Sequence, residues 1–158
     1  KYIIGNSIEG HLNMVEVAAR RSFDLMAVKG RWFAGGAFSP DGRWITFHDA
    51  SQRRMFVAPF QGETPAPENT WMSLPEELNR WSPDGAMIYG QSGRDGFTCI
   101  WAQRVDRTSK RPVGEPLPVF HAHGMRRLSG LPSIGVKEMV FALSERTGNI
   151  WMAEFKDR

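Results

Sequence analysis

A ten-residue pattern that occurs twice constrains the fold more than any other feature of the sequence. Residues 38–47 read FSPDGRWITF and residues 81–90 read WSPDGAMIYG, an offset of 43 residues. A third copy with altered turn residues, SIGVKEMVF, spans residues 133–141. A period in the forties, with several short strands in each unit, is typical of the blades of a β-propeller.

A second set of segments supports the same period. Segments with apolar residues at both ends begin 43, 45 and 50 residues apart, at 12–17, 55–60, 100–105 and 150–155. Each unit is therefore predicted to run strand, turn, strand, turn, strand. A fourth strand is expected at 23–26, 71–74 and 117–120. Pro118 has no amide hydrogen to donate, so the last of these suits an edge position.

The Ser-Pro-Asp-Gly sequence predicts a tight turn that reverses the strand. Proline fixes its own φ, aspartate can accept bonds from nearby backbone amides, and glycine tolerates a positive φ. The residues of the two turns are Ser39, Pro40, Asp41 and Gly42, and Ser82, Pro83, Asp84 and Gly85. We interpret all eight as structural. Asp41 and Asp84 belong to separate turns that the blades should hold apart, which argues against a catalytic pair.

These patterns predict an all-β chain, a partial β-propeller of about three and a half four-stranded antiparallel blades. The expected divisions are a blade part at 1–35, blades at 36–78 and 79–129, and a blade part at 130–158. Residues 2–5 resemble the second strand of a blade, and no turn of this kind precedes them. We therefore expect the rest of a longer polypeptide to complete the ring, and the isolated chain to dimerise or aggregate.

Two segments carry a family resemblance. RWSPDG at 80–85 and FSPDG at 38–42 resemble the core of the WD40-like repeat of TolB and related bacterial β-propellers. GNIWMAE at 148–154 is similar to the last blade of propellers attached to bacterial serine/threonine kinases and transcriptional regulators. The resemblance implies a propeller fold and a periplasmic or otherwise extracytoplasmic location. It does not imply a particular partner, because such propellers serve many proteins.

Catalytic motifs are missing from the sequence. GQSGR at 90–94 lacks the last glycine of the G-x-S-x-G elbow, and there is no phosphate-binding loop, dinucleotide fingerprint or HExxH motif. We therefore expect a non-catalytic binding scaffold, a protein-interaction or sensor module of a larger bacterial protein. Two alternatives stay open. One is an accessory domain that gates or docks the substrate of a hydrolase or kinase, and the other is a propeller that binds a glycan or small molecule.

The candidate interaction surface consists of polar and aromatic residues expected in loops: Trp32, Asn79, Arg80, His121, His123, Arg126 and Arg127. Four of the six tryptophans recur at strand positions, where blades must pack, and are expected in the core: Trp44, Trp81, Trp101 and Trp151. Trp32 and Trp71 lie outside the strongest repeat positions and are expected to be more exposed.

Metal, cofactor and nucleic-acid binding are not expected. His121 and His123 would share one face of a strand, but neither His11 nor His48 is near in sequence and no carboxylate adjoins the pair. We therefore predict no metal ion and no cofactor. Cys99 is expected to be a buried strand residue. The net charge of +3 comes from scattered basic pairs, which is a weak footprint for nucleic acid. No apolar run reaches the roughly 18 residues of a membrane span.

Overall fold

The computed structural model describes residues 1–75, 77–123, 126–145, 148 and 152, with the side chain of Arg126 left out. The segment predicted at 150–155, including Trp151, lies outside these residues apart from Met152. Within the described residues the chain has thirteen β-strands and one short 3-10 helix, Glu68–Thr70. The predicted all-β class is confirmed. No helix in this part of the chain has the length and hydropathy of a membrane-spanning segment.

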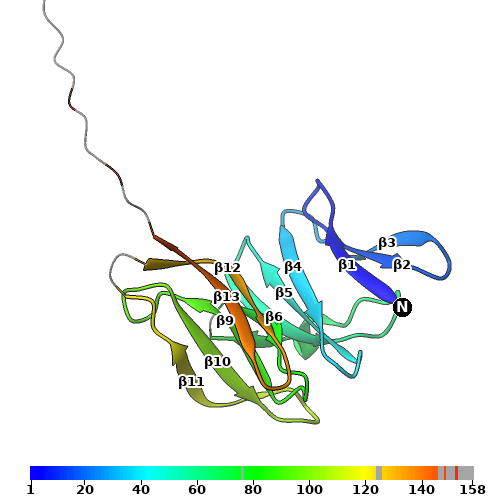
Figure 1. Ribbon diagram of the computed structural model, residues 1–158. Coiled ribbons are helices and arrows are strands. Elements are labelled where there is room, and N and C mark those ends of the chain that lie inside the picture. Colours follow the sequence, from blue (N-terminus) through cyan, green and yellow to red (C-terminus); the bar gives the residue numbers. More distant parts are fainter. Residues whose placement is uncertain (76, 124–125, 146–147, 149–151, 153–158) are drawn as a thin grey trace, which may run out of the picture.

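The strands form four antiparallel sheets that follow one another along the chain (Figure 1). The first sheet contains β1 (Tyr2–Asn6), β2 (Leu12–Glu16) and β3 (Arg21–Met26). The second contains β4 (Phe33–Phe38), β5 (Trp44–Asp49), β6 (Arg54–Pro59) and β7 (Met72–Leu74). The third contains β8 (Glu77–Trp81), β9 (Met87–Ser92), β10 (Cys99–Val105) and β11 (Pro112–Phe120). The fourth contains β12 (Arg126–Ile134) and β13 (Met139–Glu145).

Strands that are neighbours in a sheet are also neighbours in sequence. The fourth strands predicted at 23–26, 71–74 and 117–120 correspond to β3, β7 and β11, and each of them lies at the edge of its sheet. Pro118 therefore occupies the edge position that its missing amide hydrogen requires.

The two Ser-Pro-Asp-Gly turns have the same hydrogen bonds. In the first, the Ser39 hydroxyl donates to Asp41 Oδ1 (2.5 Å) and accepts a bond from the Trp44 amide (3.0 Å). In the second, the Ser82 hydroxyl donates to Asp84 Oδ1 (2.6 Å) and accepts a bond from the Met87 amide (2.9 Å). Each serine thus ties the aspartate of its turn to the strand that follows.

The glycine of each turn has a left-handed backbone, with φ of +68° at Gly42 and +66° at Gly85. We expect Gly85→Val to lower the free energy of unfolding by about 1–2 kcal/mol, since a side chain is strained in this region. The new Cβ would also lie 3.1 Å from Lys110 Nζ. Chemical denaturation measures the effect. Gly5→Val is the matched control, because exposed Gly5 lies in β1 without a positive φ and has no atom within 4 Å of its Cβ position. Equal losses from both variants would contradict the structural role of the turn.

Neighbouring sheets share apolar cores. One cluster joins the first two sheets: Leu12, Met14, Leu25, Met26, Phe33, Ile45, Phe47, Ala58 and, from a loop, Ala66. A second cluster joins the second and third sheets: Met55, Val57, Leu74, Leu78, Trp81, Ile88, Cys99, Trp101 and Val105. The second sheet therefore packs against the first sheet through one apolar cluster and against the third sheet through the other.

One hydrogen bond joins the second and third sheets, and the charge of Lys110, which is held within the third sheet, reaches the turn of the second. Trp81 Nε1 donates to the Ala37 carbonyl at 3.3 Å. Lys110 is 3% exposed, donates from Nζ to the Gly85 carbonyl (2.9 Å) and lies over the Trp81 ring. Its charge also lowers the pKa of Asp41 slightly, in addition to the larger effect of the Ser39 hydrogen bond. The Lys110 amine thus lies between the two Ser-Pro-Asp-Gly turns.

Trp71 is partly buried: it is more exposed than Trp81 and Trp101 but, unlike Trp32, it is not an exposed side chain. Its ring packs edge-on against Phe47, with centroids 4.9 Å apart, and contacts Phe33 and Phe56. Its Nε1 donates to the Ala66 carbonyl at 2.9 Å. The residue lies just before β7, and the 3-10 helix that precedes it turns the ring into the first core cluster.

A buried ion pair lies beside this aromatic cluster. Asp49 is fully buried and accepts a bond from Arg31 Nε (2.8 Å) and from the amides of Ser51 (3.0 Å) and Gln52 (3.2 Å). The Arg31 guanidinium lies 5.1 Å from the centroid of the Trp71 ring. Arg31 therefore connects the charge of Asp49 to the aromatic core.

Candidate functional site

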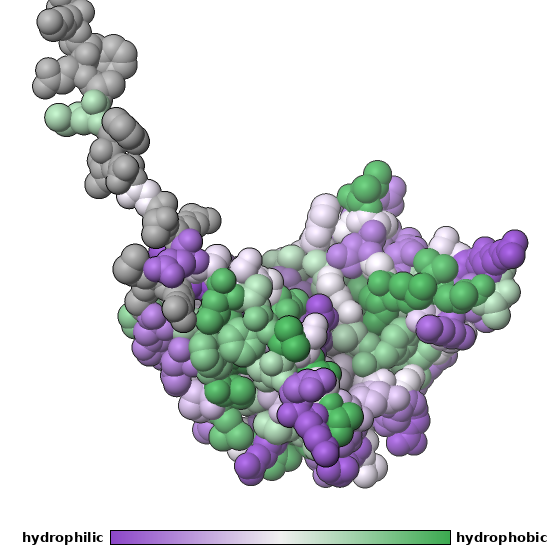
Figure 2. Space-filling view, viewed as in Figure 1, coloured by the Kyte–Doolittle hydropathy of each residue, from purple (hydrophilic) through white to green (hydrophobic). Residues whose placement is uncertain are grey.

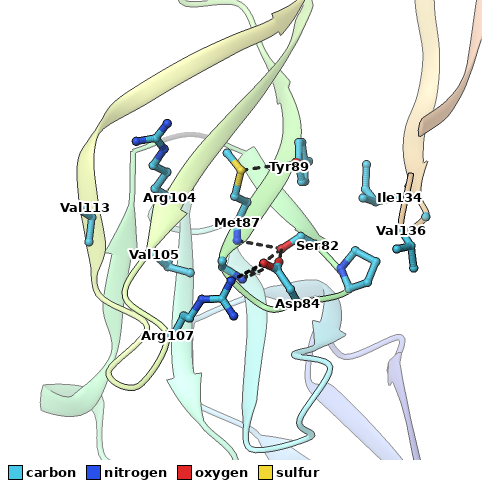
Figure 3. A pocket seen from close by; sticks show the side chains of 13 residues that line it. Ser82, Asp84, Met87, Tyr89, Arg104, Val105, Arg107, Val113, Ile134 and Val136 are labelled. Atoms are coloured by element: carbon cyan, nitrogen blue, oxygen red, sulfur yellow. Dashed lines mark hydrogen bonds and ion pairs between the residues drawn. The ribbon is translucent and has the colours of Figure 1, made fainter. Parts of the chain in front are cut away.

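The main candidate site is an apolar pocket between the third sheet and the β12–β13 hairpin (Figure 3). Its volume is about 590 Å³. Its walls are formed by Ser82, Pro83, Asp84, Ala86, Met87, Tyr89, Arg104, Val105, Arg107, Val113, Ile134, Gly135 and Val136. Ile134 to Val136 come from the hairpin, and the other residues come from the third sheet. We call this cavity the hairpin pocket.

Two arginines give the hairpin pocket positive charge. Arg107 donates to Asp84 Oδ2 at 2.7 Å, so its guanidinium already has an acidic partner (Figure 3). The hydrogen bond from the Ser82 hydroxyl lowers the pKa of Asp84, with help from the Ala86 amide, and this keeps the carboxylate ionised. Arg104 is exposed and has no ion-pair partner among the residues that the structure describes. Arg104 is therefore the cation available to a ligand.

Exposed apolar side chains lie on the strands and the turn that form the hairpin pocket, and two of them, Val113 and Val136, line it. These side chains are Val113, Leu117 and Val119 on β11, Val136 in the β12–β13 turn, and Val140 and Leu143 on β13. Figure 2 shows hydrophobic side chains gathered over this part of the molecule. Contiguous exposed apolar surface of this kind marks interaction sites in soluble proteins.

A smaller cavity, about 190 Å³, lies where three sheets meet. It is lined by Ala34, Gly35, His48, Met55, Glu77, Asn79 and Leu131. Asn79 Oδ1 is buried there and accepts no hydrogen bond from any described residue. A donor such as water would satisfy this oxygen. The cavity is too small for a drug-sized ligand, whose pockets span roughly 300–1,000 Å³.

The predicted interaction residues do not form one surface. Trp32 is 51% exposed and its ring lies against Gly10 in the turn between β1 and β2. Asn79 and Arg80 are half-buried in β8. Arg127 is exposed on β12, and Arg126 belongs to the same strand, with its side chain outside the described part. None of these residues lines the hairpin pocket.

His121 and His123 lie directly after β11, both partly exposed. The prediction that they lack further metal ligands is wrong, because the fold brings Asp95 and Cys99 to them. All four potential ligand atoms lie within 4.8 Å of one another. Cys99 is buried at the start of β10, as predicted, and burial raises the pKa of its thiol.

The sequence reasoning missed the hairpin pocket altogether. Most of its apolar residues lie in strands, where the alternation of apolar and polar residues predicts only which side chains enter the core. The turn at 134–138 was interpreted only as a third copy of the repeat with altered turn residues. One signal was available: the run of Val113, Leu117 and Val119 along an edge strand places apolar residues where a soluble chain usually has polar ones.

No protein-family model matches the chain, and no curated protein has a significantly similar sequence.

Proposed function

We propose that the chain is a non-catalytic β-propeller scaffold that binds a protein partner through the hairpin pocket. The observation that carries this proposal is the pocket itself, a cavity of about 590 Å³ with mostly apolar walls, formed by strands that carry further exposed apolar side chains. An apolar cavity with a few convergent polar groups is the usual form of a binding site.

The propeller part of the proposal is supported by the repeat and by the order of the sheets. Each of the two inner sheets has four strands in a simple up-and-down order, with a Ser-Pro-Asp-Gly turn between its first two strands. Successive sheets share apolar layers. Radially repeated four-stranded sheets that pack against their neighbours are the design of a propeller.

The chemistry of the hairpin pocket favours a peptide segment with an apolar anchor and an acidic neighbour. Met87, Tyr89 and Ile134 offer an apolar surface for the anchor. Arg104, which is not paired with any described acidic residue, can hold a carboxylate at the rim. An aromatic or aliphatic side chain seated in such a pocket is the usual source of most of the binding energy.

Panning a displayed library of random peptides against the purified chain tests the proposal. We expect enriched peptides to carry an apolar residue next to Asp or Glu. Val136→Asp and Arg104→Glu should each weaken binding at least about tenfold, since each removes a contact worth roughly 1.4 kcal/mol or more. Fluorescence polarisation with a synthetic peptide gives the dissociation constants. Val136 is 84% exposed, so its replacement should leave the fold intact.

Ile8→Asp is the matched control. Ile8 is 95% exposed in the turn between β1 and β2, so this variant adds the same charge at a surface apolar residue outside the pocket. Binding should be unchanged in this variant. The proposal fails if no peptide is enriched, or if peptides bind the two aspartate variants equally well. A glycan array that detects a ligand where peptides fail would favour the glycan-binding alternative.

A further inference from the structure

Two chain segments bring four metal-binding side chains together at one end of the β10–β11 hairpin, where β10 begins and β11 ends. Asp95 lies in the turn between β9 and β10, and Cys99 is the first residue of β10. His121 and His123 follow the last residue of β11. Because β10 and β11 are antiparallel, with Ile100 opposite Phe120, the start of one strand meets the end of the other. The pairing of the strands therefore creates the cluster.

The distances in the cluster are close to those of a tetrahedral site. Asp95 Oδ2 lies 2.9 Å from His121 Nδ1 and 3.6 Å from His123 Nε2. Bonds from zinc of 2.0–2.3 Å place neighbouring tetrahedral ligands roughly 3.3–3.7 Å apart. The widest pair of ligand atoms in the cluster is within 4.8 Å. A shift of about 1 Å in exposed side chains would bring all four atoms to bonding distance.

The surroundings hold these side chains in place. The Phe97 ring lies against His123, with centroids 4.3 Å apart, and the edge of Trp101 lies against His121 at 6.1 Å. Cys99 is fully buried beneath the histidine segment. These ring contacts orient the two imidazoles, whose side chains stay about half exposed, while the thiol lies in the core.

A hydrogen bond between a histidine and an aspartate does not by itself indicate a metal. The pair His11 and Asp24, joined at 2.8 Å, shows this elsewhere in the chain. The cluster at Asp95 differs because a second imidazole and a thiol share the same space. Two neutral imidazoles, a thiolate and a carboxylate each offer a lone pair that a cation between them can accept.

We propose that Asp95, Cys99, His121 and His123 bind one Zn²⁺ ion as a structural site. Two nitrogens, one sulfur and one oxygen are ligands that zinc takes in tetrahedral geometry, whereas Ca²⁺ and Mg²⁺ need sites built from oxygen. Four protein ligands leave no open position for a substrate, which is the arrangement of a structural site. The ion joins the β9–β10 turn to the segment that leaves β11.

Titration of the metal-free chain tests the site. We expect one Zn²⁺ to bind per chain, measured by isothermal titration calorimetry and elemental analysis, and to raise the melting temperature. Co²⁺ should give the visible absorption of a tetrahedral ion together with a thiolate charge-transfer band. Replacing a ligand should weaken zinc binding more than replacing a residue that only hydrogen-bonds to a ligand, which typically costs roughly 10–100-fold in affinity. The variants that test this are His121→Gln, His123→Gln and Cys99→Ser.

The matched control is His11→Gln, which removes a histidine paired with an aspartate but lacking the thiol and the second imidazole. This variant should bind zinc as the unmodified chain does. The two exposed histidines can be replaced without opening the core, so their variants remain informative if Cys99→Ser fails to fold. The proposal is overturned if the metal-free chain binds no zinc, if Co²⁺ shows no thiolate band, or if the histidine variants bind as the control does.

Discussion

Trp101→Ala is expected to lower the free energy of unfolding by about 3–5 kcal/mol, which is the usual cost of removing a large aromatic side chain from a core. Trp101 is 8% exposed and belongs to the cluster shared by the second and third sheets. The Arg94 guanidinium lies 5.0 Å from its ring centroid, so truncation also removes a cation–π contact. Urea denaturation followed by circular dichroism measures the loss, with EDTA present so that metal binding does not contribute.

Two further variants define what the Trp101 result means. Trp32→Ala should cost much less, because that side chain is half exposed. The loss of stability in Trp101→Phe should lie between those of Trp101→Ala and Trp32→Ala, because phenylalanine keeps an aromatic ring in the core. The substitution also removes Nε1, a buried donor with no described acceptor, so it breaks no described hydrogen bond. Equal losses for Trp101→Ala and Trp32→Ala would show that Trp101 is not a core residue.

Asp49→Ala is expected to destabilise the fold by a similar amount, about 3–5 kcal/mol, because it leaves a largely buried cation without its partner. Arg31 would keep only the ion pair with Glu68, whose side chain is more than half exposed. The amides of Ser51 and Gln52 would also lose their acceptor. Thermal and chemical denaturation should both report the loss, and replacing both partners, Asp49→Ala with Arg31→Met, should recover part of it.

The control for Asp49→Ala is a variant that breaks an ion pair at the surface. Glu63 pairs with Arg21, and both side chains are about half exposed. Glu63→Ala should leave the stability nearly unchanged, because exposed ion pairs contribute little. If Asp49→Ala were as mild as Glu63→Ala, the buried pair would not stabilise the fold as argued here.

The local chemistry of the sequence predicted the strands and turns well. Proline, aspartate and glycine at fixed offsets restrict the backbone to a few turn types, so the turns at 39–42 and 82–85 could be assigned without a structure. The apolar segments between turns then gave the positions of β5, β6, β9 and β10. The edge position of Pro118 followed from its missing amide hydrogen.

The zinc cluster could not be predicted in the same way, because it depends on strand register. Asp95 and Cys99 are separated from His121 and His123 by the whole β10–β11 hairpin. A third ligand was sought only near His121 and His123 in the sequence. That criterion excludes residues that are distant in sequence and come close only when two strands pair. A fourth strand expected at 117–120, antiparallel to the strand that begins near Cys99, was the signal that could have joined them.

Trp71 and Asp49 show a second limit. Repeat positions describe strands, but the side chain of Trp71 is directed by a 3-10 helix and by a hydrogen bond to Ala66, and neither feature recurs in the described part of the other units. Asp49 ends β5, where an aspartate normally caps a turn in solvent. Its burial depends on Arg31, which lies in the connection before β4, and no periodic pattern links the two.

The core shared by the second and third sheets makes residues 33–120 one cooperative unit of opening. If the third sheet separated, Met55, Val57 and Leu74 of the second would lose the apolar surface that covers them, and the hydrogen bond from Trp81 Nε1 to the Ala37 carbonyl would break at the same time. Neither sheet can then open at a free energy far below that of its neighbour. Amide hydrogens in β5 and β9, although on different sheets, should therefore exchange with solvent at similarly slow rates.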